Sequence, residues 1–222
     1  MASVGDKVRS HFHETAGEFD SIYTGDKGPL SRWLDRVFRW DMYERYTRTV
    51  GECSEPGLEV LDIGCGSGRF SVAVAKAGAR EVVGLDFAEA MLGIAQGLAE
   101  KEGVGDRCTF QTADFMEHGF DREFDVALAI GLFDYVPDPL PFLKKMRRLS
   151  RKKIVATFPL KWTWRAPVRK VRLALRGCPV YFFTKPQVEK LMADAGFTSA
   201  TVERIGKIYF VVGNCSAEKD DA

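Results

Sequence analysis

The sequence predicts an α/β domain built on a mostly parallel β-sheet. Three observations support this fold class. From residue 58 onward, short apolar segments alternate with longer segments of helical periodicity. Gly78, Gly103 and Gly196 end three of the helical segments. Two apolar segments around Gly206-Lys207 close the chain and predict a terminal hairpin, so the repeated strand–helix units before it argue for parallel strands.

Two helical segments precede the first predicted strand. Residues 8–23 form one of them, and residues 30–50 form the second, with apolar side chains at steps of three and four. We expect residues 1–50 to be an N-terminal helical cap. The sheet domain would cover residues 51–215, followed by a flexible polar tail at 216–222.

Seven strands and four helices are expected after this cap. The predicted strands are residues 58–62, 81–86, 107–111, 125–130, 153–158, 200–205 and 208–212. The predicted helices are residues 70–77, 88–101, 139–149 and 186–195. An irregular insertion at about 159–180 separates the fifth strand from the last helix.

Length and composition fit a single domain. The chain has 222 residues, of which 45% are hydrophobic, enough for a substantial core. No apolar run approaches the ~20 residues that cross a bilayer, and residues 1–7 lack the apolar core of a signal peptide. The five cysteines show no paired spacing of metal ligands. We therefore expect a cytoplasmic protein without a metal.

Charge is unevenly distributed along the chain. Fourteen Lys and Arg residues and no acid lie between Asp138 and Glu189, although the net charge is only +1. A positive face directed at an anionic partner would explain this segregation. For residues 144–153 an ordinary solvated surface explains it equally well.

The most specific motif is Val-Leu-Asp-Ile-Gly-Cys-Gly-Ser-Gly at residues 60–68. An apolar strand carries Asp62 near its end and turns through Gly64, Gly66 and Gly68 into a helical segment. Glycines allow the backbone to approach a ligand closely. An acid before the turn suits a ligand with a cationic end or with hydroxyls. This motif resembles the cofactor loop of class I S-adenosylmethionine (SAM) methyltransferases.

A dinucleotide-binding loop is the main alternative. Its glycines follow the spacing G-x-G-x-x-G. Here Arg69 occupies the third glycine position and Gly68 comes one residue early. Asp62 would also repel a pyrophosphate, so the spacing and the acid both favour the methyltransferase resemblance.

The resemblance covers about residues 58–212 and has implications for fold and cofactor. It implies a Rossmann-like, seven-stranded, mostly parallel sheet with one antiparallel strand and helices on both faces. It also implies SAM as the cofactor, S-adenosylhomocysteine (SAH) as the product, and no metal.

Candidate cofactor residues lie at predicted strand ends, where open α/β sheets bind ligands. Asp86 could accept both ribose hydroxyls, although a helix-cap role is the alternative because a helix follows. Asp114-Phe115 resembles the adenine-binding pair of the family, and Asp62 would lie near the methionine ammonium. Tyr23 resembles an aromatic residue that closes over the cofactor, with a core position as the alternative. The full expected set is Asp62, Gly64, Cys65, Gly66, Gly68, Asp86, Phe87, Asp114, Phe115, Ile130 and Tyr23.

Candidate catalytic residues follow the fourth strand. Residues 130–139 resemble the Leu-Glu-His-Val-Pro-Asp segment of quinone-type small-molecule methyltransferases, but Tyr135 stands at the position of the histidine. Asp134 or Tyr135 could orient or deprotonate an acceptor, or could be structural. His11 could reach the acceptor if the cap folds over the site, or could face solvent.

The insertion contains the acceptor-binding candidates Trp162, Trp164, Arg165 and Arg169. An apolar stripe and several cations alternate along residues 164–176, which suits an anionic acceptor or a membrane surface. A lid whose stripe packs on the domain is the alternative. The region is similar in part to magnesium-protoporphyrin O-methyltransferases.

The sequence therefore predicts a SAM-dependent methyltransferase acting on an oxygen, or less readily a nitrogen, of a small, apolar, anionic acceptor. One alternative is an RNA or protein methyltransferase that docks through residues 139–188. Another is a catalytically silent SAM-binding module. Nucleic acid is disfavoured because neither an Asn/Asp-Pro-Pro-Tyr motif nor a Pro-Cys loop occurs. Nothing in the sequence indicates an oligomeric state.

Overall fold

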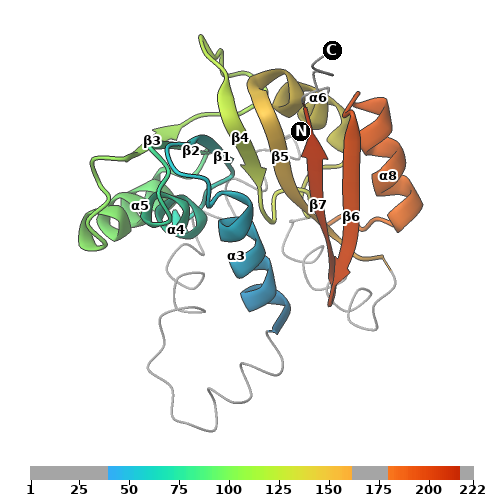
Figure 1. The fold of residues 1–222 in the computed structure, drawn as a ribbon, viewed down its shortest axis with the longest axis horizontal. Helices are drawn as coiled ribbons and strands as arrows, with labels where there is room; N and C mark the ends of the chain where they lie inside the picture. Colours follow the sequence, from blue (N-terminus) through green and yellow to red (C-terminus); the bar gives the residue numbers. More distant parts are fainter. Residues whose placement is uncertain (1–39, 162–179, 216–222) are drawn as a thin grey trace, which may run out of the picture.

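The structure, a computed structural model, describes residues 40–161 and 180–215 (Figure 1). These residues form one seven-stranded sheet with the strand order β3-β2-β1-β4-β5-β7-β6. The strands are β1 (Glu59–Ile63), β2 (Glu81–Asp86), β3 (Cys108–Thr112), β4 (Phe124–Ala129), β5 (Ser150–Pro159), β6 (Ser199–Ile205) and β7 (Ile208–Asn214). The described helices are α3 (Trp40–Glu52), α4 (Arg69–Lys76), α5 (Glu89–Lys101), α6 (Pro139–Leu149) and α8 (Lys185–Asp194).

The pairing of the strands confirms the predicted sheet. Strands β1 to β5 pair in parallel, and β7 runs antiparallel to both β5 and β6. The strand order reverses at β1, which lies between β2 and β4. In open α/β sheets, ligands bind beyond the carboxyl ends of the strands at such a reversal. The topology therefore predicts a ligand site at the ends of β1, β2 and β4.

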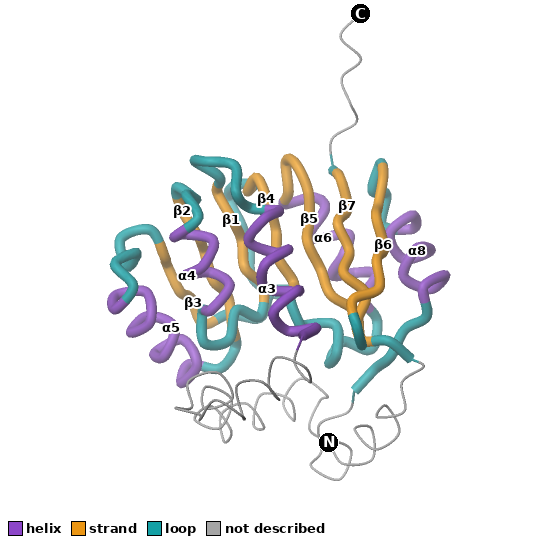
Figure 2. Tube along the Cα trace, turned by 60° about the horizontal axis from the view of Figure 1, so that its bottom comes forward, coloured by secondary structure: helices purple, strands orange, loops and turns teal. Residues whose placement is uncertain are grey.

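Helices cover both faces of the sheet (Figure 2). Helices α3 and α4 lie on one face, where Val60, Val74 and Ala99 belong to one buried apolar cluster. Helices α6 and α8 lie on the other face, where Met146 and Val188 belong to a larger cluster. The prediction of helices on both faces is confirmed. No helix among the described residues is both long and apolar enough to cross a membrane.

Strand β5 begins three residues before its predicted start. Ser150 already pairs with Phe124 of β4. Apolar periodicity missed this start because the next three residues are cations. They pair with acids from other segments: Arg151 with Glu59, Lys152 with Glu55, and Lys153 with Glu52, at 2.7, 2.5 and 2.6 Å. These three side chains are therefore neutralised locally and do not form a free positive face.

The amino edge of the sheet has its own ion-pair network. Glu59 is only 9% exposed, and its carboxylate contacts Arg80, Arg122 and Arg151. Its backbone N–H donates to Asp125 Oδ2 at 2.9 Å. The network fixes the start of β1 at the edge opposite the expected ligand site, which indicates a structural role.

The predicted helical cap is described only in part. Helix α3 corresponds to the second half of the helix expected at 30–50 and extends two residues further, to Glu52. The helix expected at 8–23 lies outside the described residues, as does the tail at 216–222. The proposed division into a cap, 1–50, and a sheet domain, 51–215, stays a prediction.

Candidate functional site

The glycine turn follows β1 directly. Gly64, Gly66 and Gly68 have φ values of 69°, 53° and 72°, in the left-handed region that favours glycine. The backbone N–H groups of Gly64 and Cys65 both donate to Leu85 O, at 2.8 and 3.0 Å. The end of β2 therefore holds the turn at the carboxyl edge of the sheet.

Asp86 links this turn to the next helix. Its Oδ2 accepts from Gly66 N, and its Oδ1 accepts from Ala88 N, both at 2.9 Å. Burial raises the pKa of Asp86, and backbone hydrogen bonds from Ala88, Gly66 and Phe87 oppose that rise. A carboxylate offers about four acceptor positions, so the three backbone contacts leave acceptor capacity for a ligand. The helix-cap role and a role in ligand binding are thus compatible at Asp86.

The three glycines have different surroundings. A Cβ on Gly68 would lie 2.7 Å from Ala95 Cβ, so this glycine allows α4 to begin close against α5. A Cβ on Gly66 would meet only Met91 Cε, at 3.4 Å. A Cβ on Gly64 would meet Leu132 Cδ1 at 3.1 Å. Gly68 therefore serves helix packing, whereas an added Cβ on Gly64 or Gly66 would meet one side chain only.

Asp62 lies beneath the turn. It is 2% exposed, and its Oδ2 accepts a 2.6 Å hydrogen bond from Ser71 Oγ. Burial raises the pKa of Asp62 to about 6; the Ser71 hydrogen bond opposes the rise, and the nearby charge of Asp86 adds to it. The fold itself compensates the negative charge of Asp62 poorly, so a ligand cation placed near this carboxylate would be stabilised by it.

The loop after β3 gives Asp114 and Phe115 different surroundings. Asp114 is exposed, and its Oδ1 accepts from Met116 N at 2.7 Å. Phe115 is 5% exposed, and its ring packs against Phe120 and Phe142 at centroid distances of 5.9 and 5.8 Å. The ring of Phe115 therefore packs in the core, and the expectation that it also flanks a ligand stays a prediction.

The loop after β4 closes the other side of the turn. Gly131, with φ 82°, donates its N–H to Thr157 Oγ1 at 2.8 Å. Leu132 then lies over Gly64, as the close approach of its Cδ1 shows. Asp134 and Tyr135 follow and are half-buried, and Asp134 O accepts from Tyr181 N at 2.9 Å. The predicted catalytic pair thus lies on the loop whose Leu132 contacts Gly64.

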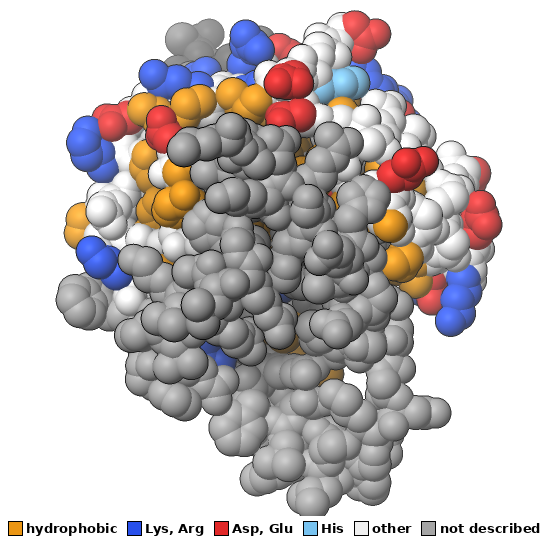
Figure 3. Space-filling view, turned by 180° about the vertical axis from the view of Figure 1, so that it is seen from behind, with side chains coloured by type: hydrophobic (Ala, Val, Ile, Leu, Met, Phe, Trp, Pro, Cys, Tyr) orange, Lys and Arg blue, Asp and Glu red, His pale blue; other side chains and the backbone are white. Residues whose placement is uncertain are grey.

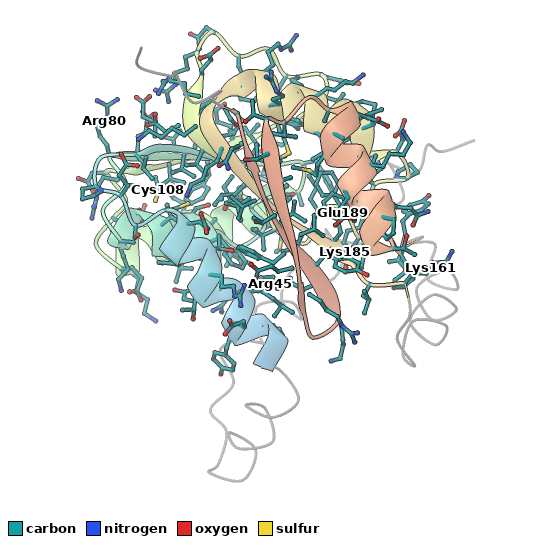
Figure 4. The ribbon with its side chains drawn as sticks, turned by 45° about the vertical axis from the view of Figure 1, so that its right-hand side comes forward. Arg45, Arg80, Cys108, Lys161, Lys185 and Glu189 are labelled. Atoms are coloured by element: carbon teal, nitrogen blue, oxygen red, sulfur yellow. The ribbon has the colours of Figure 1, made fainter. Side chains whose placement is uncertain are left out.

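Arg45 on α3 also reaches this edge (Figure 4). Its Nη1 would lie 3.8 Å from a Cβ on Gly131, and its Cζ lies 5.7 Å from the Phe70 ring centroid. The buried Nε of Arg45 has no hydrogen-bond partner among the described residues. A guanidinium with an unused buried donor is suited to an anionic ligand group. Sequence patterns did not single out Arg45, since only the packing of α3 brings it here.

Comparisons with known proteins agree with this geometry. Residues 60–153 match a family model described as a methyltransferase domain. A ubiquinone biosynthesis O-methyltransferase from Ruegeria sp. is 41% identical over 95 residues, which are 43% of this chain and 38% of that protein. A magnesium-protoporphyrin O-methyltransferase from Synechocystis sp. is 27% identical over 90% of each chain.

A solved structure shows the same fold. The crystal structure of a Synechocystis magnesium protoporphyrin IX methyltransferase with bound SAH has a TM-score of 0.77 and 23% identity, covering 96% of this chain and 100% of that one. The Rossmann-like fold implied by the resemblance is therefore confirmed. The chain spans about two fifths of the length of the matched Ruegeria protein.

The remaining predicted site residues divide into two groups. Phe87 and Ile130 are half-buried at the ends of β2 and β4, and Cys65 is buried in the turn. The other group lies outside the described residues: Tyr23, His11, Trp162, Trp164, Arg165 and Arg169. On the described surface in Figure 3, Lys and Arg side chains are interspersed with Asp and Glu. No group of three or more metal-ligating side chains occurs among the described residues.

Proposed function

We propose that this protein binds SAM at the carboxyl edge of β1, β2 and β4 and transfers its methyl group to an oxygen of a small acceptor. The bridge from Asp86 to Gly66 carries this proposal. One strand-end carboxylate fixes the glycine turn and would also accept from the ribose hydroxyls. The methyltransferase-domain match over these same residues supports the cofactor.

The other charged groups suit the two ends of this cofactor. Asp114 would accept the exocyclic amine of adenine, with its exposed carboxylate beside β3. Asp62 would compensate the methionine ammonium, directly or through a water. Arg45 would pair with the methionine carboxylate, because its buried Nε lacks a described partner next to Gly131. Complementary charges at both ends would fix the direction in which the cofactor lies.

Methyl transfer from SAM requires little of the protein beyond aligning the methyl group with the acceptor. Bound SAM supplies an electrophilic methyl group for an in-line displacement. Leu132 and Gly131 would shape the wall that excludes water, and Asp134 or Tyr135 would orient the acceptor or take its proton. Both candidates lie on the loop that packs over Gly64, which supports their reach to the transferred methyl.

The acceptor itself is proposed from sequence and relatives. The named relatives methylate a ubiquinone precursor and a magnesium porphyrin, as their names state. We infer a small, apolar and anionic acceptor, bound in part by Trp162, Trp164, Arg165 and Arg169. Contact with a membrane surface and a cytoplasmic location remain part of this proposal.

Calorimetry with full-length protein tests the site. SAM and SAH should bind and NADH should not. Arg45→Gln should weaken SAM binding about tenfold, since a charge-assisted hydrogen bond is lost. The same change should leave decarboxylated SAM, which lacks the carboxylate, unaffected. Arg48→Gln is the matched control, because Arg48 on the same helix pairs with Glu44 and Glu203 instead. NADH binding in place of SAM would refute the proposal.

A further inference from the structure

Lys145 makes an unusual set of contacts with the loop after β3. Its ammonium donates to the backbone oxygens of Phe115, Met116 and His118, at 2.5, 3.0 and 2.7 Å. An ammonium has three donors, so all three are used on one short loop. Lys145 thus holds three backbone carbonyl groups of this loop from a single point.

Aromatic rings complete the environment of this ammonium. Its Nζ lies 5.0 Å from the Phe115 ring centroid and 5.5 Å from that of Phe120. Both distances are within the range of cation–π attraction. Burial lowers the pKa of Lys145, the charge of Arg148 adds to this, and Asp114 opposes it. Carbonyl oxygens and rings therefore replace the acidic partner that such a lysine commonly has.

The helix that carries Lys145 is rigidly placed. Leu143, Met146 and Leu149 of α6 are buried in the core on the α6–α8 side of the sheet. Asp138 caps the helix by accepting from Leu140 N at 3.2 Å. The loop after β3 is therefore attached to a fixed element rather than to another loop.

Asp114 stands on the loop that Lys145 holds. Asp114 O accepts from the N–H groups of Glu117 and His118, at 3.2 and 2.8 Å, and its Oδ1 accepts from Met116 N. Oδ2 of Asp114 accepts no hydrogen bond from the described residues. The loop thus turns its carbonyls toward Lys145 and keeps one carboxylate oxygen for a ligand.

We propose that Lys145 is a positioning residue for recognition of the purine base: it fixes the loop so that Asp114 can accept from the exocyclic amine. This inference rests on the proposed function, because Asp114 is assigned there to adenine. Lys145 acts through Asp114 and touches no cofactor atom. Its contribution should appear as discrimination between bases and not only as stability.

Two ligands separate these effects. SAH carries the exocyclic amine, whereas S-inosylhomocysteine carries a carbonyl oxygen in its place and offers Asp114 no donor at that position. Wild type should bind SAH at least about tenfold more tightly, as expected for a hydrogen bond to a charged acceptor. Lys145→Met should reduce that ratio at least about fivefold, mainly by weakening SAH. Lys144→Met, at the exposed neighbouring position, should leave the ratio unchanged.

A second variant covers the case in which Lys145→Met does not fold. Lys145→Gln keeps two N–H donors for the loop and should still lower the ratio. A lower melting temperature with an unchanged ratio in either folded variant would show a purely structural role and overturn the inference. In an Asp114→Asn background, Lys145→Gln should have no further effect on the ratio, and a full effect there would also overturn it. Failure of wild type to bind SAH would instead refute the proposed function.

Discussion

The pH dependence of folding should report the buried carboxyl of Asp62. This residue is 2% exposed, and burial raises its pKa from 3.8 to about 6. The folded state therefore holds the proton more tightly than the unfolded state. Stability from this group is fully present below about pH 4 and is lost as the pH rises through about 6. At neutral pH the loss amounts to about 3 kcal/mol.

Asp62→Asn isolates this contribution. The variant removes the titration but keeps an oxygen that can accept from Ser71 Oγ. Between pH 4.5 and 7.5 the free energy of unfolding of wild type should fall by about 2 kcal/mol relative to the variant. Urea titrations of both proteins at the two pH values measure this difference, and the other carboxyl groups cancel because both proteins contain them. A wild-type-minus-variant difference that does not change with pH would refute the reasoning.

Cofactor binding should reverse the pKa shift of Asp62. An ammonium near the carboxylate favours its ionised form. SAH should therefore release a proton from wild type at pH 5.5 and bind more tightly as the pH rises to 7. Calorimetry at pH 5.5 in two buffers of different ionisation enthalpy measures the released proton. Equal apparent enthalpies in the two buffers would contradict the placement of the ammonium.

Three further predictions concern other residues. Asp86→Ala should weaken SAM binding at least about tenfold, because it removes two proposed hydroxyl acceptors and the anchor of Gly66; an unchanged calorimetric affinity would rule out this placement of the ribose. Gly68→Ala should lower the free energy of unfolding by about 1–3 kcal/mol, since its Cβ would lie 2.7 Å from Ala95 and its φ is 72°. Gly97→Ala, with no atom near its added Cβ, is the matched control and should be neutral or stabilising in urea titrations. Glu59→Gln should destabilise the fold yet leave SAH affinity unchanged, because its arginine partners lie at the amino edge; a loss of affinity in the folded variant would contradict that assignment.

Local signals in the sequence predicted most of the fold. Apolar strands, helical periodicity and helix-ending glycines placed the described elements to within a few residues, and β2 and α6 matched their predicted bounds. The early start of β5 was missed because its first residues are charged. Their role in the strand depends on acids at Glu52, Glu55 and Glu59, which no local window contains.

The sequence predicted those parts of the candidate site in which a charged residue lies at the end of a strand. Asp62 and Asp86 stand in the strands and thus meet at the turn. The core packing of the Phe115 ring was not predicted, because the order Asp-Phe does not reveal which way the ring turns. Arg45 and Lys145 were missed for a related reason. Each is an ordinary cation on an amphipathic helix, and only tertiary packing brings it to its partners.

Methyl transfer from SAM is the central claim, and a labelled-methyl assay tests it most directly. Full-length protein would be incubated with methyl-labelled SAM and a library of small anionic and apolar acceptors, with Asp86→Ala as the matched negative control. The proposed function predicts label in at least one small acceptor, with one SAH formed for each methyl transferred and little product from the variant. Label that appears only in RNA or protein, or SAM that binds but yields no SAH with any acceptor, would contradict it.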